Sequence, residues 1–283
     1  KRKSSGAGVG FQHSKADRGP MSELVYRVYP LPDSLFDYVW DFGALTKLDQ
    51  KSYINKMLGD VKNADLITEL VAASQEYISN PECQGCSAVS LRDVRRFKTL
   101  LAFFEHDLEA RMRIKPERMN QYKSHSENKK RRERKEEITI VLAIAHCYHA
   151  RLSINELRDD FCGMIAELWR DLGDRHNQGN WWGNRTYYYV TSKWIKEVIE
   201  KEQKDFVVRM ELESGTALNG ALLENTFVLL VSILNRLPVF LVGKPGSSKS
   251  LSMELINSNL RGKDSKDDYF KTLPHIHKLG YQG

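Results

Sequence analysis

The stretch FLVGKPGSSKSL, residues 240–251, has the residue types and spacing that hold nucleotide phosphates. In the pattern G-x-x-x-x-G-K-[S/T], loop N–H groups and the N-terminus of the next helix surround the β-phosphate. The lysine neutralises β- and γ-phosphate charge, and the hydroxyl ligates Mg²⁺. Here Gly243 is the first glycine, Lys249 the lysine and Ser250 the hydroxyl, while Ser248 stands in the place of the second glycine. The candidate binding residues are Gly243, Lys244, Pro245, Gly246, Ser247, Ser248, Lys249, Ser250 and Leu251.

The segments on either side of this loop are those that a phosphate loop requires. TALNGALLENTFVLLVSILNRLP is apolar nearly all round, which predicts a buried helix, and VFLVG predicts a short buried strand. SLSMELINSNL predicts the helix that follows the loop. Strand, glycine loop and helix in this order favour phosphate binding over a turn with an incidental lysine. Ser248 argues the other way, because a glycine there lets the backbone approach phosphates without a Cβ.

Hydrolysis needs more chain than follows the loop. Mg²⁺-assisted cleavage requires an acidic residue on a later strand and a group that positions water. The residues after the last predicted helix are RGKDSKDDYFKTLPHIHKLGYQG, in which Asp264, Asp267 and Asp268 lie in a polar loop and follow no apolar strand. We therefore expect nucleotide binding here without hydrolysis, and we assign no metal site to these three aspartates.

The rest of the chain predicts a mostly α protein with a partial α/β end. Residues 1–22 are irregular, ELVYRVYPLP is a short extended segment, and a small helical bundle spans roughly Ser34 to Met112, with Ser90 opening a long helix. Residues 111–135 are a charged linker or a solvent-facing helix. Residues 136–216 form a helical connector, and 217–283 open the phosphate-loop core.

Composition restricts the class of protein. The longest apolar run, FVLLVSIL, is far shorter than the roughly 20 residues that span a bilayer, and the four cysteines do not make a disulfide framework. We therefore expect a soluble, cytoplasmic protein without a transmembrane segment. Cys83 and Cys86 have the spacing of two zinc ligands, with His146, Cys147 and His149 as distant partners, but ordinary loop and core cysteines are the plainer interpretation.

A resemblance to a known family is carried by five stretches: LVYRVYPLPDSLFDYVWDFG, VSLRDVRRF, LAIAHCYHARL, ALNGALLENTFVLLV and LPVFLVGKPGSSKSL. Together they resemble the mysterin family, giant AAA+ ATPases that are also RING E3 ubiquitin ligases. The similarity runs from about Gly8 to Gly283, is strongest in 24–46, 89–104 and 217–251, and is weak across 111–137 and 172–208. The serine in GKPGSSKSL that replaces the second glycine is itself similar to that family.

The resemblance implies a piece of a ring of six AAA modules, with ATP and Mg²⁺ as cofactors of the loop and Ser250 on the metal. Residues 23–110 would be the helical lid of one module, and 217–283 the truncated start of the next module's core. Lid helices of such proteins often begin with an arginine that reaches the γ-phosphate of a nucleotide, and Arg92 in SLRD matches that place. A local salt bridge of Arg92 with Asp93 or Glu105 is the alternative.

The implied partners are neighbouring AAA modules and, for the whole family member, ubiquitin and an E2 conjugating enzyme. The zinc of the RING lies outside this segment, because four scattered cysteines cannot supply its eight ligands. A different class of function also fits, namely a helical scaffold or interaction protein with a vestigial phosphate loop. Nucleic-acid binding through the basic run Lys129 to Lys135 is a weaker hypothesis, since no aromatic residues are interleaved with these charges.

Overall fold

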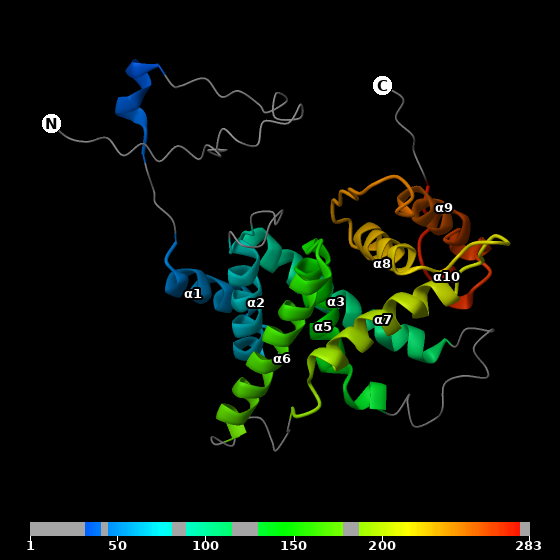
Figure 1. Cartoon of the computed structure of the whole chain (residues 1–283), viewed down its shortest axis with the longest axis horizontal. Coiled ribbons are helices and arrows are strands. Elements are labelled where there is room, and N and C mark those ends of the chain that lie inside the picture. Colours follow the sequence, from blue (N-terminus) through cyan, green and yellow to red (C-terminus); the bar gives the residue numbers. More distant parts are fainter. Residues whose placement is uncertain (1–31, 41–44, 81–88, 115–129, 178–186, 278–283) are drawn as a thin grey trace. The chain divides into compact units, whose positions relative to one another are not determined.

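The computed structural model of the chain describes residues 32–40, 45–80, 89–114, 130–177 and 187–277 (Figure 1). The chain divides into two units, residues 1–44 and 45–283. In the first unit the described element is the 3-10 helix η2, Asp33–Tyr38. The extended segment expected at ELVYRVYPLP and the pair Cys83 and Cys86 lie outside the described residues.

The regular elements in the described part of the second unit are helices. Its longer helices are α1 (Lys47–Leu58), α2 (Ala64–Ser79), α3 (Leu91–Arg113), α5 (Lys135–Cys147), α6 (Asn155–Asn177), α7 (Ser192–Val208), α8 (Gly220–Leu234) and α9 (Lys249–Asn259). Short helices η4 (His149–Arg151), η5 (Gly262–Asp264) and α10 (Asp268–Lys271) complete it. The expectation of a mostly α protein is therefore confirmed. None of the described helices is both long and apolar enough to cross a membrane.

Side-chain caps set the starts of several helices. Ser90 and Asp93 form a capping box at α3, in which the Ser90 backbone N–H donates to Asp93 Oδ2 at 2.8 Å. Thr191 accepts from the Trp194 N–H at the start of α7, and Asn219 accepts from the Leu222 N–H at the start of α8. These caps accept hydrogen bonds from backbone N–H groups that have no partner inside the helix. The local sequence therefore determines where these helices begin.

Helix α5 is the central element of the second unit, because ten of its thirteen residues are buried. It packs against α3, α7 and α2 (Figure 1). Three buried phenylalanines join the elements around it: Phe104 of α3 stacks on Phe227 of α8, and Phe206 of α7 lies beside Phe227, each pair with ring centroids 6.0 Å apart. Burial of such rings is the main source of stability in a core of this kind.

A buried ion network links α3 and α7. The Arg111 guanidinium donates to Asp107 at 2.8 Å and to Asp205 at 2.6 Å, contacts Glu202, and lies over the Phe206 ring at 4.2 Å. Burial alone would lower the pKa of Arg111, but the three carboxylates together raise it well above its ordinary value. Arg111 is therefore charged at any accessible pH, and it holds three carboxylates that could not otherwise be buried.

The strand expected at VFLVG is wrong for the described structure. Residues 237–244 form neither helix nor strand, and β pairing in the described part of the chain is limited to an isolated bridge between Arg261 and His275. Phe240 and Val242 are 92% and 94% exposed. A helix pairs its own backbone groups, but a strand needs a neighbouring strand to accept and donate its hydrogen bonds, and no described segment supplies one. The α/β part of the expected fold is thus not formed here.

Candidate phosphate-binding loop

The loop that leads into α9 contains two residues with left-handed backbone angles. Gly246 has a φ of 81°, and Ser248, the N-cap of α9, has a φ of 59°. Ser248 makes no side-chain capping bond, and the first turn of α9 carries no acidic residue. The positive end of the helix dipole and the unpaired N–H groups of that turn therefore face the loop without a competing carboxylate.

Lys249 is folded back into this loop. Its ammonium donates to the Gly243 carbonyl at 2.7 Å, the Lys244 carbonyl at 2.8 Å and the Ser247 hydroxyl at 2.9 Å. An ammonium has three N–H groups, so these oxygens satisfy all of them. A phosphate that enters the loop must therefore replace at least one of these oxygens.

Gly243 has a steric role at the start of the loop. A Cβ at this position would lie 2.9 Å from the Ser247 hydroxyl oxygen and 3.7 Å from Lys249 Nζ. Any side chain here would push against the group that holds the ammonium. The first glycine of the motif thus leaves room for the hydroxyl that accepts from the lysine.

The remaining predicted residues surround the lysine or begin the helix. Lys244 and Pro245 are exposed in the turn, and the Ser247 hydroxyl donates to the Lys244 carbonyl at 2.8 Å. Ser250 is exposed in the first turn of α9, and Leu251 beside it is half-buried. The structure therefore brings Gly243, Lys244, Ser247 and Lys249 into contact and leaves the Ser250 hydroxyl at the surface.

Asn225 of α8 is a contact that sequence reasoning missed. Its side-chain amide donates to the Ser247 carbonyl at 2.7 Å across 22 residues of chain. Because a trans peptide points its C=O and N–H in opposite directions, this bond turns the Ser248 N–H away from α8. The available signal was the pair Glu224 and Asn225, an acid and an amide inside a mostly apolar helix; Glu224 pairs with Arg158 of α6.

Arg92 lies exposed in the first turn of α3. The carboxylates offered as its local partners bind other cations: Asp93 pairs with Arg96 and Arg151, and Glu105 with Lys135. In the described part of the chain, Arg92 therefore forms no salt bridge with Asp93 or Glu105.

The aspartates after α9 have structural roles. Asp267 caps α10 by accepting from the Tyr269 and Phe270 N–H groups, and it also pairs with Arg209. Asp268 pairs with Lys271 at 2.7 Å. Both carboxylates therefore have partners within the chain.

Of the distant zinc candidates, Cys147 is buried and His146 and His149 are half-buried. Within the described ranges, no group of three or more His, Cys, Asp or Glu side chains could hold a metal ion. Burial lowers the pKa of His146 to about 4, and His146 lies 3.1 Å from the Ser232 hydroxyl of α8. Burial likewise raises the pKa of the Cys147 thiol to about 12. A protonated thiol and a histidine engaged with α8 are typical of packing, not of metal ligation.

Comparison with known proteins places this loop in a family. The family model described as the RNF213 AAA domain matches residues 215–283, which contain the whole loop. Human E3 ubiquitin-protein ligase RNF213 is 33% identical over 292 aligned residues, zebrafish (Danio rerio) E3 ubiquitin-protein ligase rnf213-beta 31% over 293, and mouse RNF213 30% over 292. Each alignment covers 98% of this chain and 5% of the relative.

The chain therefore spans about one twentieth of the length of the curated relatives it matches. The alignments nevertheless take in almost every residue of the chain, and the helices and the loop described above fall inside the aligned part. On this evidence the chain belongs to the RNF213, or mysterin, family and is a segment of its AAA domain region.

Proposed function

We propose that residues 243–251 bind ATP as the opening of an AAA module, with Ser250 as a ligand of the Mg²⁺ that accompanies the nucleotide. The observation that carries this proposal is the position of the Lys249 ammonium, inside a glycine loop at the N-terminus of α9. Mg²⁺ would neutralise phosphate charge, and the exposed Ser250 hydroxyl has the chemistry and the place to hold it.

Three features of the chain would contribute to phosphate binding. Lys249 exchanges the neutral Gly243 and Lys244 carbonyl oxygens for negatively charged phosphate oxygens, so that both partners of each hydrogen bond are charged. Asn225 holds the Ser247 carbonyl at α8, so the Ser248 N–H stays on the side of the peptide from which a phosphate can approach. The first turn of α9 adds further N–H donors and its partial positive charge.

We propose that ATP hydrolysis and ubiquitin transfer belong to other parts of the family's proteins. The relatives are named E3 ubiquitin-protein ligases, and this chain aligns with 5% of their length. The segment would contribute nucleotide binding and packing between neighbouring AAA modules in the cytoplasm. Ubiquitin, an E2 enzyme and the zinc of a RING would be engaged elsewhere.

Substitution of Lys249 tests nucleotide binding directly. The 283-residue chain is titrated with ATP and Mg²⁺ and followed by calorimetry and by the shift of its unfolding temperature, since a ligand of the native state stabilises by RT ln(1 + [L]/Kd). Lys249→Ala should weaken both signals strongly. Lys244→Ala is the matched control, because Lys244 serves the loop with its carbonyl and not with its side chain. Equal ATP binding by Lys249→Ala and the unchanged chain would overturn the proposal.

A second function, a helical scaffold with a vestigial loop, is favoured by one feature of the same site. All three donors of Lys249 are satisfied by the loop itself, so the loop is stable without a nucleotide. On this reading the chain unfolds cooperatively and ATP with Mg²⁺ gives no thermal shift. The titration above therefore separates the two functions.

We further propose that Arg92 acts as a lid arginine, reaching towards a nucleotide held by the module that precedes α3. Its exposure at the start of α3, with the local carboxylates committed elsewhere, supports this role. In a family protein that carries that module, Arg92→Ala should lower its ATP turnover, whereas Arg95→Ala, exposed one turn later, should not. Equal turnover in both variants would exclude the role.

A further inference from the structure

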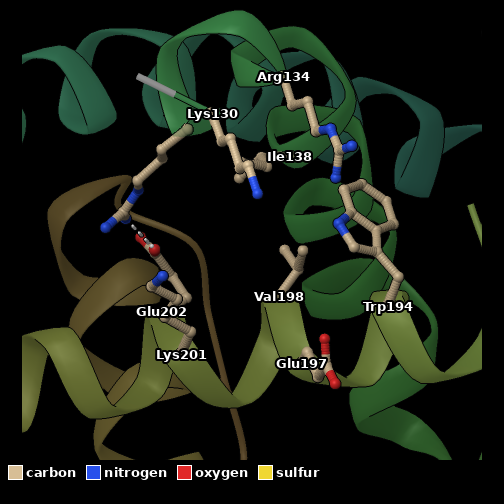
Figure 2. Close-up of a pocket in the computed structure, with 9 residues that line it drawn as sticks. Lys130, Arg134, Ile138, Trp194, Glu197, Val198, Lys201 and Glu202 are labelled. Carbon is tan, nitrogen blue, oxygen red and sulfur yellow. Dashed lines mark hydrogen bonds and ion pairs between the residues drawn. The ribbon is translucent and has the colours of Figure 1, made fainter. Parts of the chain in front are cut away.

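A pocket of about 260 Å³ lies between α7 and the start of α5, separate from the phosphate loop (Figure 2). Its apolar wall is formed by Ile138, Trp194 and Val198. Figure 2 shows Trp194 and Val198 rising from α7, with Lys130 and Arg134 reaching towards them from the opposite helix. The pocket thus combines an apolar, partly aromatic wall with cationic groups.

The lining of this pocket is positively charged. Lys130, Arg131, Arg134 and Lys201 line it, against the carboxylates Glu197 and Glu202. Glu202 pairs with the buried Arg111 and with Arg131, whose guanidinium lies 2.7 Å from it, so the excess comes from the other three cations against Glu197. An anion that enters the pocket would therefore meet a net positive field.

The cationic and aromatic groups are held in place before any ligand enters. The Arg134 guanidinium lies over the Tyr189 ring at 3.7 Å, and the Tyr189 ring meets the Trp194 ring edge to face at 5.5 Å. Arg131 is fixed by Glu202 at the other end. Pre-ordered side chains lose less rotamer freedom on binding, which favours affinity for a small ligand.

From this arrangement we propose that the pocket binds a small organic phosphate with a flat ring attached, of the size of a nucleoside monophosphate. Lys130 and Arg134 take the phosphate, since ammonium and guanidinium groups are the usual phosphate donors in proteins. Trp194, Ile138 and Val198 take the ring, because an aromatic side chain stacks on the face of a base. The site is independent of the phosphate loop and of the function proposed for it.

The probe for this site is 5′-AMP, which lacks the β-phosphate that a phosphate-loop lysine holds. It is titrated calorimetrically into the full 283-residue chain carrying Lys249→Ala, so that the loop cannot contribute. Adenosine and inorganic phosphate are titrated in parallel. We expect AMP to bind about 10-fold more tightly than either, because each of them lacks one half of the contacts.

Substitutions locate the binding in the pocket. Lys130→Ala and Trp194→Leu should each weaken AMP binding about 5-fold or more. Arg132→Ala is the matched control, since Arg132 is exposed in the same basic run but does not line this pocket, and it should leave AMP binding unchanged. Lys130 is itself exposed, so its removal does not threaten the fold.

Three outcomes would overturn the proposal. One is no AMP binding by the Lys249→Ala chain, and another is an equal loss on Lys130→Ala and Arg132→Ala, which would mean diffuse attraction to the basic run. The third is binding of inorganic phosphate as tight as that of AMP, which would remove the role of the aromatic wall. A selective loss in Lys130→Ala and Trp194→Leu supports the site.

Discussion

At the scale of single residues, Ser248 is the departure from the usual phosphate-loop pattern that matters most. Its φ of 59° lies in the left-handed region, where a Cβ costs about 1–2 kcal/mol and glycine costs nothing. This is the physical reason that the pattern usually has glycine at this position. The sequence alone identified the substitution, but only the backbone angle shows that the serine is strained.

We expect Ser248→Gly to raise the free energy of unfolding by about 1 kcal/mol, by relieving that strain, and to tighten ATP binding because the Cβ beside the phosphates is lost. Urea unfolding and ATP titration of the 283-residue chain measure the two effects. Ser247→Gly is the contrast: it removes the hydroxyl that accepts from Lys249 at 2.9 Å, so it should weaken the loop. A Ser248→Gly chain that is less stable than the parent would contradict this account.

His146 makes stability depend on pH. Burial lowers its pKa to about 4, with the Val228 carbonyl opposing that shift, whereas an unfolded histidine titrates near its ordinary value of 6.5. Between these values the unfolded chain binds a proton that the folded chain does not. The stability that His146 contributes is therefore complete above pH 6.5 and is lost as the pH falls towards 4.

The expected loss is about 2–3 kcal/mol across that window, and urea unfolding at pH 7.5 and pH 5 measures most of it. His146→Gln should flatten part of the slope, because glutamine can keep a hydrogen bond to Ser232 without titrating. The rest of the pH dependence would come from His149, because burial also lowers its pKa to about 4. His106→Gln, at an exposed position of α3, serves as the control, and a slope unchanged by His146→Gln would contradict the assignment.

At the scale of elements, helices were predictable where the strand was not. The Ser90 cap and the apolar spacing after it gave the start of α3 correctly, because caps and helical hydrogen bonds involve residues three or four apart. The apolar run VFLVG gave the wrong element, since a strand exists only when another strand pairs with it. The Asn225 contact with the loop could not be predicted either, because it joins α8 to a loop residue 22 positions later that it meets only in the folded chain.

Residues 240–242 should contribute little to the stability of this chain. Phe240 and Val242 are almost fully exposed, so replacing them with Ser and Thr should change the free energy of unfolding by no more than about 0.5 kcal/mol. The double variant should also self-associate less, as judged by light scattering, because it loses an exposed apolar edge. Leu255→Ala, at a buried position of α9, is the contrast and should cost about 2–4 kcal/mol. A comparable loss in the Phe240 and Val242 variant would show that partners cover this segment.

At the scale of the whole molecule, buried charges tie the part that matches the AAA domain to the helices before it. Tyr269 of α10 donates its hydroxyl to Asp107 of α3, which also accepts from Arg111. Arg209 at the end of α7 pairs with Asp267, the cap of α10. These residues are up to 162 positions apart in the sequence, so no periodicity or spacing could have revealed the network.

Tyr269→Phe tests whether this network anchors the C-terminal helices. The change removes one charge-assisted hydrogen bond of about 1.5–3 kcal/mol and keeps the ring, so protection from amide hydrogen exchange should fall around α10 and little elsewhere. Tyr77→Phe is the matched control, because the Tyr77 hydroxyl donates to the Leu157 carbonyl and should loosen α2 and α6 instead. A uniform fall in protection after Tyr269→Phe would mean that the network stabilises the whole unit, whereas a local fall makes α10 a separately released element. A local fall would also mean that the contacts of α10 stabilise no helix beyond α3 and α7. Movement at the AAA-matching end could then leave α1 and α2 undisturbed.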